Sequence, residues 1–130
     1  MKMTKMMAFG IAAAIAATTG TAIAGDAPKA WKKCKSCHSI EPGKHKIGPS
    51  LAGVMGRQAG TAEGFTKYKA MKGASFTWDA EKMDAWITDQ KKFLKANADI
   101  VGGPKTSMSA KIKKEKDRKA IIEYLMEGDD

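Results

Sequence analysis

The stretch Cys34-Lys35-Ser36-Cys37-His38 contains both cysteines of this 130-residue chain and one of its two histidines. On a helix, Cys34 and Cys37 project from the same side, and His38 leans over that side as well. Two thiols placed in this way can add to the two vinyl groups of a haem, while the imidazole reaches the iron. The C-x-x-C-H spacing is therefore typical of a c-type haem attachment site.

Three other uses of this motif are possible. A zinc site could add His45, but adjacent cysteine and histidine ligands give poor tetrahedral geometry, and no second ligand pair has finger-like spacing. A redox dithiol needs a strand before the motif in a βαβ setting, and the sequence predicts no strand there. A disulfide across two intervening residues would be strained at ordinary Cα distances. We therefore favour one haem c, covalently attached through Cys34 and Cys37.

A haem would also explain the loop-forming segment 39–66, which has six glycines, two prolines and no helical or strand period. Loops of this length usually serve a function, and this one has a cofactor to wrap around. The Gly48-Pro49 pair would let the Pro49 carbonyl approach His38 and accept its second ring proton. Such a bond would fix the orientation of the imidazole.

The ligand on the opposite side of the iron decides between a carrier of electrons and a haem that binds small molecules. The candidates are Met55, Met71, Met83, Met108, Met126 and His45. Met83 lies on an apolar helical face and Met126 near a helix end, so both are expected to pack. His45 is too close to His38 in sequence to reach the opposite face, and we expect it to brace the loop. Met108, in a distant loop, is favoured, and its thioether would raise the potential relative to a second histidine.

The remaining patterns predict helices and loops, with no alternating strand and no internal repeat. Helices are expected over 26–37, briefly over 68–72, over 79–89 and over 114–127, with a second loop over 95–110. Asp26 is the expected N-cap of the first helix, and Gly128 is expected to stop the last. The fold class predicted is all-α, with helices and long loops around one haem, because the apolar helical faces are too few to enclose a core alone.

Residues 1–24 have the pattern of a cleaved signal peptide. Lys2 and Lys5 precede an apolar stretch that ends in small residues. A single anchoring helix is the alternative, but the apolar run is short for one. We expect cleavage after Ala24, export to the periplasm, and a single domain over 25–130.

The chain is strongly basic, with 23 Lys and Arg against 14 Asp and Glu and a formal net charge of +9. This charge favours acidic partners. Export argues against nucleic acid, and we expect a monomer without stable membrane insertion. Docking on acidic patches of redox proteins should be transient and weakened by salt. The lysines expected around the haem edge, the lysine set, are Lys33, Lys35, Lys44, Lys46, Lys91, Lys92, Lys105, Lys111 and Lys113.

The motifs CKSCH, the Gly48-Pro49 turn, GRQAG and TSM follow one another in an order that resembles the class I cytochromes c. The likeness covers nearly all of 26–126 and is closest to the mitochondrial-like bacterial branch, whose members are photosynthetic or respiratory periplasmic proteins. It implies the cytochrome c fold, with His38 and Met108 as iron ligands.

The resemblance also implies a soluble one-electron carrier that is not an enzyme. It would shuttle electrons between a quinol-oxidising complex or dehydrogenase and a terminal oxidase, reductase or photosynthetic reaction centre. The alternative is a haem enzyme or small-molecule sensor with a labile sixth ligand.

The resemblance further implies roles for residues outside the haem-attachment motif. Arg57 corresponds to a buried arginine near a haem propionate, and Trp78 and Thr106 correspond to residues whose N–H and O–H bond a propionate. Trp31 and Tyr124 correspond to an aromatic pair on the first and last helices.

The sequence departs from the family pattern at three places. Lys67 stands where the family has a propionate-binding tyrosine, and Tyr68 follows one residue later. Ala110 replaces an aromatic that usually shields the haem edge. The 94–107 loop is longer than in the mitochondrial form.

Overall fold

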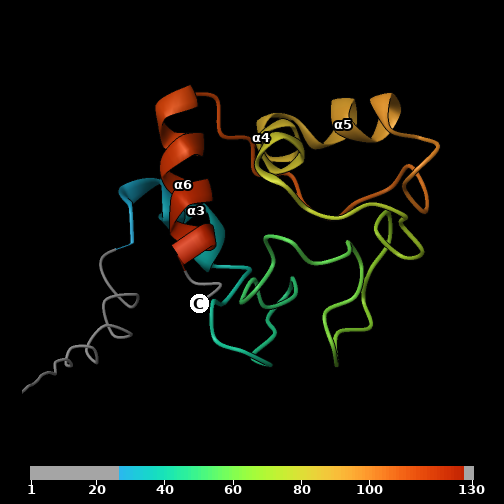
Figure 1. Cartoon of the computed structure of the whole chain (residues 1–130), viewed down its shortest axis with the longest axis horizontal. Helices are drawn as coiled ribbons and strands as arrows, with labels where there is room; N and C mark the ends of the chain where they lie inside the picture. The colour runs from blue at the N-terminus through green and yellow to red at the C-terminus, as the bar shows by residue number, and fades with distance from the viewer. Residues whose placement is uncertain (1–26, 128–130) are drawn as a thin grey trace, which may run out of the picture.

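The structure, a computed structural model, describes residues 27–127, so the predicted signal peptide, the Asp26 cap and the Gly128 stop lie outside the described residues. Within 27–127 the chain forms helices and loops without a strand (Figure 1). One isolated β-bridge joins Gln58 to Thr77. No helix in this range is long and apolar enough to cross a membrane. The elements are η2 (Lys29–Trp31), α3 (Lys32–Lys35), α4 (Ala80–Thr88), α5 (Gln90–Ala96) and α6 (Glu115–Glu127).

The first helical segment is shorter than the predicted helix over 26–37. It begins as the 3-10 turn η2 and becomes the α-helix α3, which ends at Lys35. The N–H groups of Cys37 and His38 both donate to the Cys34 carbonyl, at 3.1 and 2.9 Å. The shared acceptor tightens the last turn and ends the helix at the motif itself.

The predicted helix over 79–89 is confirmed as α4. The Asp79 side chain caps it by accepting a hydrogen bond from the Lys82 N–H at 2.7 Å. Asp89 ends α4 with extended backbone and also caps α5, where its side chain accepts from the Lys92 N–H. The sequence analysis did not predict α5, which buries Phe93 and Leu94.

The short helix predicted over 68–72 is wrong. Residues 69–73 form turns, in which Lys72 donates to the Lys69 carbonyl and Ala74 donates to the Met71 carbonyl. Gly73 follows with φ of +78°, a left-handed conformation that a helix cannot continue through. The segment is a series of tight turns against the cavity.

The last helix is confirmed, since α6 covers 115–127 within the predicted range 114–127. It packs against η2 and α4 and lies beside α3 in Figure 1. Trp31 and Tyr124 meet edge to face with ring centroids 5.2 Å apart, as the family resemblance implied. Ile121 and Leu125 are buried on the same side of the helix.

The long loop is irregular, as predicted, but it is tied down by its own contacts. Leu51 N–H donates to the Ser39 carbonyl at 2.8 Å. His45 accepts from the Ser50 N–H with Nδ1 at 3.0 Å, and its Nε2 donates to the Glu63 carbonyl at 2.8 Å. His45 therefore joins two distant parts of the loop, and the prediction that it braces the loop is confirmed.

Candidate haem site

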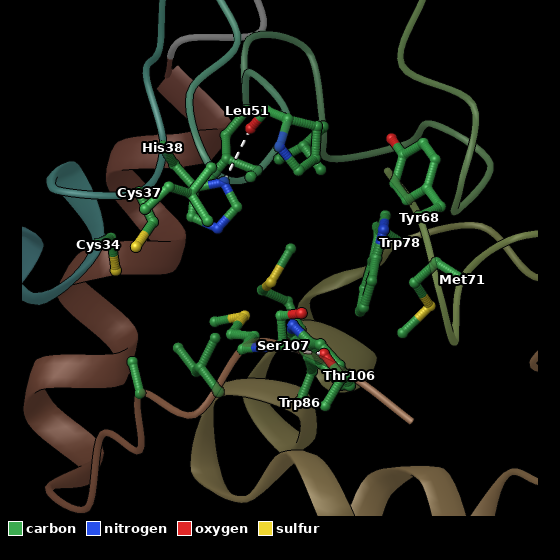
Figure 2. Close-up of a pocket in the computed structure, with 18 of the residues that line it drawn as sticks. Cys34, Cys37, His38, Leu51, Tyr68, Met71, Trp78, Trp86, Thr106 and Ser107 are labelled. Atoms are coloured by element: carbon green, nitrogen blue, oxygen red, sulfur yellow. Dashed lines mark hydrogen bonds between the residues drawn. The ribbon is translucent and has the colours of Figure 1, made fainter. Parts of the chain in front are cut away.

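A cavity of about 310 Å³ lies between the N-terminal motif, the long loop and the segment before α6. Figure 2 shows Cys34, Cys37 and His38 on one side of it, with Thr106 and Ser107 across from them. Its lining is largely apolar and includes Leu51, Val54, Met71, Met83, Trp86, Ile87, Met108, Ile121 and Leu125.

Both cysteines of the motif face this cavity as free thiols, so no disulfide joins them. Cys34 is only 6% exposed on α3, and Cys37 is half-buried in the turn that follows. Burial raises the pKa of the Cys34 thiol to about 11, with a smaller contribution from the nearby Cys37. The two sulfurs thus lie along one wall, where they could bond to a single flat group inside the cavity.

The His38 ring is fixed by the loop that follows it. Its Nδ1 donates to the Pro49 carbonyl at 2.8 Å, as predicted, which leaves Nε2 as the nitrogen with a free lone pair. Burial lowers the pKa of His38, with the Pro49 bond opposing the shift and Lys46 adding to it, so the neutral imidazole is favoured. Neutral imidazole is the form that binds a metal.

Gly48 makes this arrangement possible. A Cβ atom at Gly48 would lie 2.7 Å from Nδ1 and 2.9 Å from Nε2 of the His38 ring, closer than real contacts allow. Its N–H donates to the Cys37 carbonyl at 2.7 Å, which holds the loop against the motif.

Of the six candidates for the opposite ligand, Met71, Met83 and Met108 line the cavity. In Figure 2, Met71 lies beyond Trp78, away from His38. Met83 is 4% exposed on α4, in the apolar core cluster. The other three candidates are absent from the lining, and Met126 is 49% exposed.

The segment that carries Met108 is held on both sides of it. Before it, the Met108 N–H donates to the Thr106 hydroxyl at 3.1 Å. After it, the Ile112 N–H donates to the Ile87 carbonyl at the end of α4, at 2.8 Å. The first bond orders the segment internally, and the second holds it against α4 beside the cavity.

Polar groups gather where the long loop borders the cavity. Arg57 donates through Nη1 to the Ala52 carbonyl at 2.9 Å and through Nη2 to the Ser50 carbonyl at 3.3 Å. Its buried Nε has no partner in the described part of the chain, so a donor remains for an acidic group. The Tyr68 hydroxyl accepts from the Ala62 N–H and keeps its own proton to donate.

Two of the three family departures are also located at this cavity. Lys67 and Tyr68 both line it, so the one-residue offset leaves the tyrosine at the site and adds a lysine beside it. Trp78, Thr106 and Ala110 line it as well.

The sequence analysis missed Gln90, which is 1% exposed and bonds to the backbone of Ala110. A glutamine in a run of lysines gives no sequence signal of burial.

The lysine set is exposed throughout. Lys44 pairs with Glu41 at 3.6 Å and Lys111 with Asp89 at 3.7 Å. The rest of the set makes no ion pair with the residues of 27–127, and Lys33 borders the cavity. Most of these ammonium groups are therefore available to an acidic partner.

The residues that surround the cavity fit a covalently attached haem. Two thiols and one imidazole lie along one wall, an apolar lining matches the macrocycle, and the unpartnered Arg57 Nε suits a carboxylate. No group of three or more His, Cys, Asp or Glu that could hold a bare metal ion occurs within 27–127.

Comparison with known proteins identifies the family. The cytochrome c family model matches residues 19–129. The chain is 40% identical to a cytochrome c2 iso-2 of Magnetospirillum molischianum over 100 residues, covering 77% of this chain and 95% of that one. It is 38% identical to a cytochrome c2 iso-1 of Rhodospirillum centenum over 116 residues, covering 82% and 94%.

Solved structures give the same result. The structure of cytochrome c2 from Rhodospirillum centenum superposes with a TM-score of 0.64 at 34% identity, over 87% of this chain and 98% of that one. Cytochrome cH from Methylobacterium extorquens superposes with a TM-score of 0.61 at 36% identity, over 78% and 98%. The family binds one haem c through a cysteine pair, which here is Cys34 and Cys37. The chain belongs to the cytochrome c family, as an all-α electron carrier of the class I, bacterial c2 type.

Proposed function

We propose that this chain is a periplasmic one-electron carrier whose haem iron is held by His38 and Met108. The observation that carries the proposal is the geometry of the two walls of the cavity. The Nδ1 bond to Pro49 leaves Nε2 of His38 free to ligate. Thr106 and Ser107 lie across the cavity from His38 (Figure 2), and Met108, the next residue, lines the same cavity.

The haem supplies a reversible one-electron iron couple, and the protein fixes its surroundings. Cys34 and Cys37 would hold the group covalently, so that it would stay bound in both oxidation states. Pro49 orients His38 and increases the basicity of its imidazole. A methionine sulfur from Met108 favours the reduced state relative to a second histidine.

Four side chains would hold the haem propionates. Arg57 offers its buried Nε, and Tyr68 and Thr106 each accept a bond from a backbone N–H, which leaves their hydroxyl protons to donate. Trp78 is 7% exposed in the lining and offers its indole N–H. Donors that neutralise buried carboxylates lower the cost of their burial.

The electron would leave and enter through the haem edge without bond making, after docking on an acidic patch of a partner. The lysine set is exposed and mostly unpaired within 27–127, which supports this mode. Candidate partners are a quinol-oxidising complex or dehydrogenase as donor, and a terminal oxidase, reductase or photosynthetic reaction centre as acceptor. A cleaved signal peptide over 1–24 would deliver the chain, as a monomeric domain over 25–130.

The test is the visible spectrum of the reduced protein, made in a host that attaches haem, before and after carbon monoxide is added. An unchanged spectrum supports two protein ligands and the carrier function. Conversion to a carbonyl-bound form would overturn it in favour of an enzyme or sensor with a labile sixth ligand. Absence of a haem spectrum would overturn the interpretation of the Cys34–His38 motif.

Docking has a separate test, the rate of electron exchange with an acidic redox protein as salt is raised. The account predicts a steep fall in the bimolecular rate constant, because screening weakens the steering of opposite charges. A rate constant that does not depend on salt would contradict docking through the lysine set.

A further inference from the structure

Gln90, the first residue of α5, is a polar side chain in a fully buried position. It is 1% exposed, which places it among the most buried large side chains of the described chain. Its Nε2 donates to the Ala110 carbonyl at 2.6 Å. Its Oε1 is buried and has no hydrogen-bond partner within 27–127.

Stability alone does not account for a glutamine here. Burial of an amide is unfavourable unless its groups are hydrogen-bonded, and here one of the two is unpaired. An apolar side chain of the same volume would fill the same space without an unpaired acceptor. The one bond that Gln90 makes is therefore the feature to explain.

That bond lies two residues after Met108. The carbonyl of Ala110 can only accept, so the amide nitrogen of Gln90 must face it. The next two residues contact the same junction between α4 and α5: the Lys111 ammonium pairs with Asp89 at 3.7 Å, and the Ile112 N–H donates to a carbonyl of α4.

Of these three contacts, the one made by Gln90 comes from a buried side chain and reaches the residue nearest to Met108 in sequence. The Lys111 pair is partly exposed, with side chains 45% and 23% accessible, and such pairs contribute little. The Ile112 bond is backbone to backbone and lies two residues further along. Gln90 is thus the side chain that fixes the chain just after the sulfur ligand.

We propose that Gln90 is a positioning residue for the iron ligand Met108. Its hydrogen bond holds the Ala110 carbonyl in place, so that the segment cannot move away from the cavity and release the Met108 sulfur. The inference rests on the proposed function, in which Met108 ligates the iron. Gln90 does not line the cavity, so it would act through the backbone of the segment alone.

The test is Gln90→Met, which keeps the volume and removes both amide groups. The matched control is Gln58→Met, because Gln58 Nε2 makes the same type of bond to the Ala74 carbonyl at 3.0 Å, outside the ligand segment. Imidazole binding to the ferric protein reports displacement of Met108, and urea unfolding reports global stability.

The expected result is an increase of about fivefold in imidazole affinity for Gln90→Met, which is the equivalent of one ordinary hydrogen bond. The long-wavelength charge-transfer band of sulfur on ferric iron should weaken at a lower imidazole concentration. The unfolding midpoint should stay at or above that of Gln58→Met, since an unpaired acceptor is also removed. Gln58→Met should bind imidazole as the wild type does.

Imidazole affinity within twofold of the wild type for Gln90→Met would overturn the role of Gln90. An increase in imidazole affinity that only matches a loss in the free energy of unfolding would also overturn the role of Gln90. So would an equal increase in affinity for Gln58→Met. Gln90→Leu repeats the test if the methionine variant does not fold. A wild type without the sulfur-to-iron band would instead refute Met108 ligation, and with it the proposed function.

Discussion

Replacement of Gly48 by alanine tests how the loop positions the His38 imidazole. The new methyl group would lie 2.7 Å from Nδ1 and 2.9 Å from Nε2, where an ordinary contact needs at least 3.4 Å. Either the ring or the 46–49 backbone must move by more than half an ångström. Both movements lengthen the 2.8 Å bond from Nδ1 to the Pro49 carbonyl.

The expected loss of stability has two parts. Overpacking costs roughly 1–3 kcal/mol, and the weakened bond to Pro49 costs about 1 kcal/mol. The sum is a loss of about 2–4 kcal/mol in the free energy of unfolding. The reduction potential should rise, because an imidazole with a weaker Nδ1–H bond donates less charge to the ferric iron.

The assays are urea unfolding followed by circular dichroism and a potentiometric titration of the haem. Gly103→Ala is the matched control, because a Cβ atom at Gly103 would meet nothing within 4 Å and its φ is not left-handed. Its stability should stay within about 0.5 kcal/mol of the wild type. The reasoning is refuted if Gly48→Ala has wild-type stability and potential.

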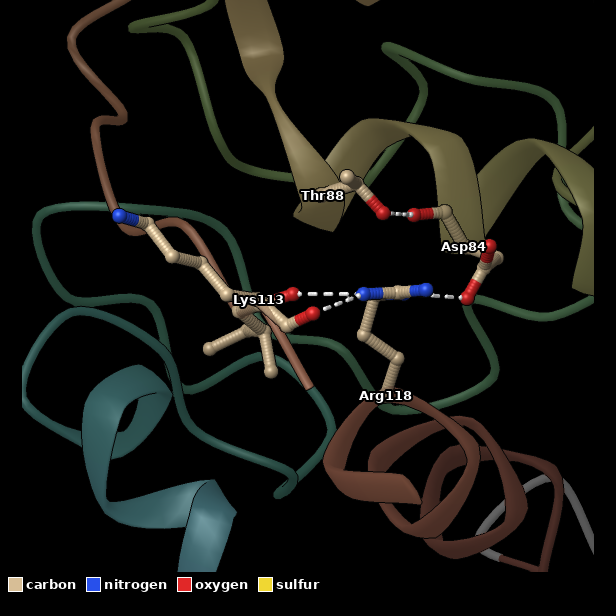
Figure 3. Close-up of polar contacts among 5 residues, drawn as sticks. Asp84, Thr88, Lys113 and Arg118 are labelled. Carbon is tan, nitrogen blue, oxygen red and sulfur yellow. Dashed lines mark hydrogen bonds and ion pairs between the residues drawn. The ribbon is translucent and has the colours of Figure 1, made fainter. Parts of the chain in front are cut away.

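Three further predictions concern the scaffold around the site. The pKa of Asp79 is lowered chiefly by the hydrogen bond from the Lys82 N–H. The Asp79 carboxylate therefore stabilises the fold above the pKa that it has in the unfolded chain, and this stabilisation is lost as pH falls through its lower pKa in the folded chain. Asp79→Asn should therefore lose less stability than the wild type between about pH 5 and pH 3 in acid unfolding. Arg118 bonds to Asp84 at 2.7 Å and to two carbonyls of the segment before α6 (Figure 3). Arg118→Leu should therefore lower the free energy of unfolding in urea by about 2–4 kcal/mol. An unchanged free energy of unfolding would contradict this role of Arg118. Gly102→Ala places a methyl group against the backbone of the turn at 69–73. It should lower the midpoint of thermal unfolding by several degrees. An unchanged midpoint would show that the loop can move to accommodate the methyl group.

The sequence predicted the residues that chemistry constrains most. The five-residue motif, the His38–Pro49 bond and the role of His45 were all found in the structure, because each depends on local spacing or on a side chain with few alternatives. The helix over 79–89 was predicted for the same reason, since its apolar face is a local signal.

The errors arose where tertiary contacts decide the structure. The helix α5 carries only two buried apolar side chains among lysines, and its start depends on the extended backbone of Asp89. The residues at 68–72 form turns against the cavity instead of a helix. The burial of Gln90 depends on a backbone carbonyl 20 residues away, which no local pattern reveals.

The most direct test of the central claim is the iron X-ray absorption spectrum of the oxidised protein, recorded beside that of Met108→Ala. The account predicts one axial sulfur and one axial nitrogen in the wild type, and loss of the sulfur in the variant. A wild-type spectrum without an axial sulfur would contradict ligation by methionine. A sulfur retained in Met108→Ala would assign the ligand to Met71 or Met83, the other methionines that line the cavity.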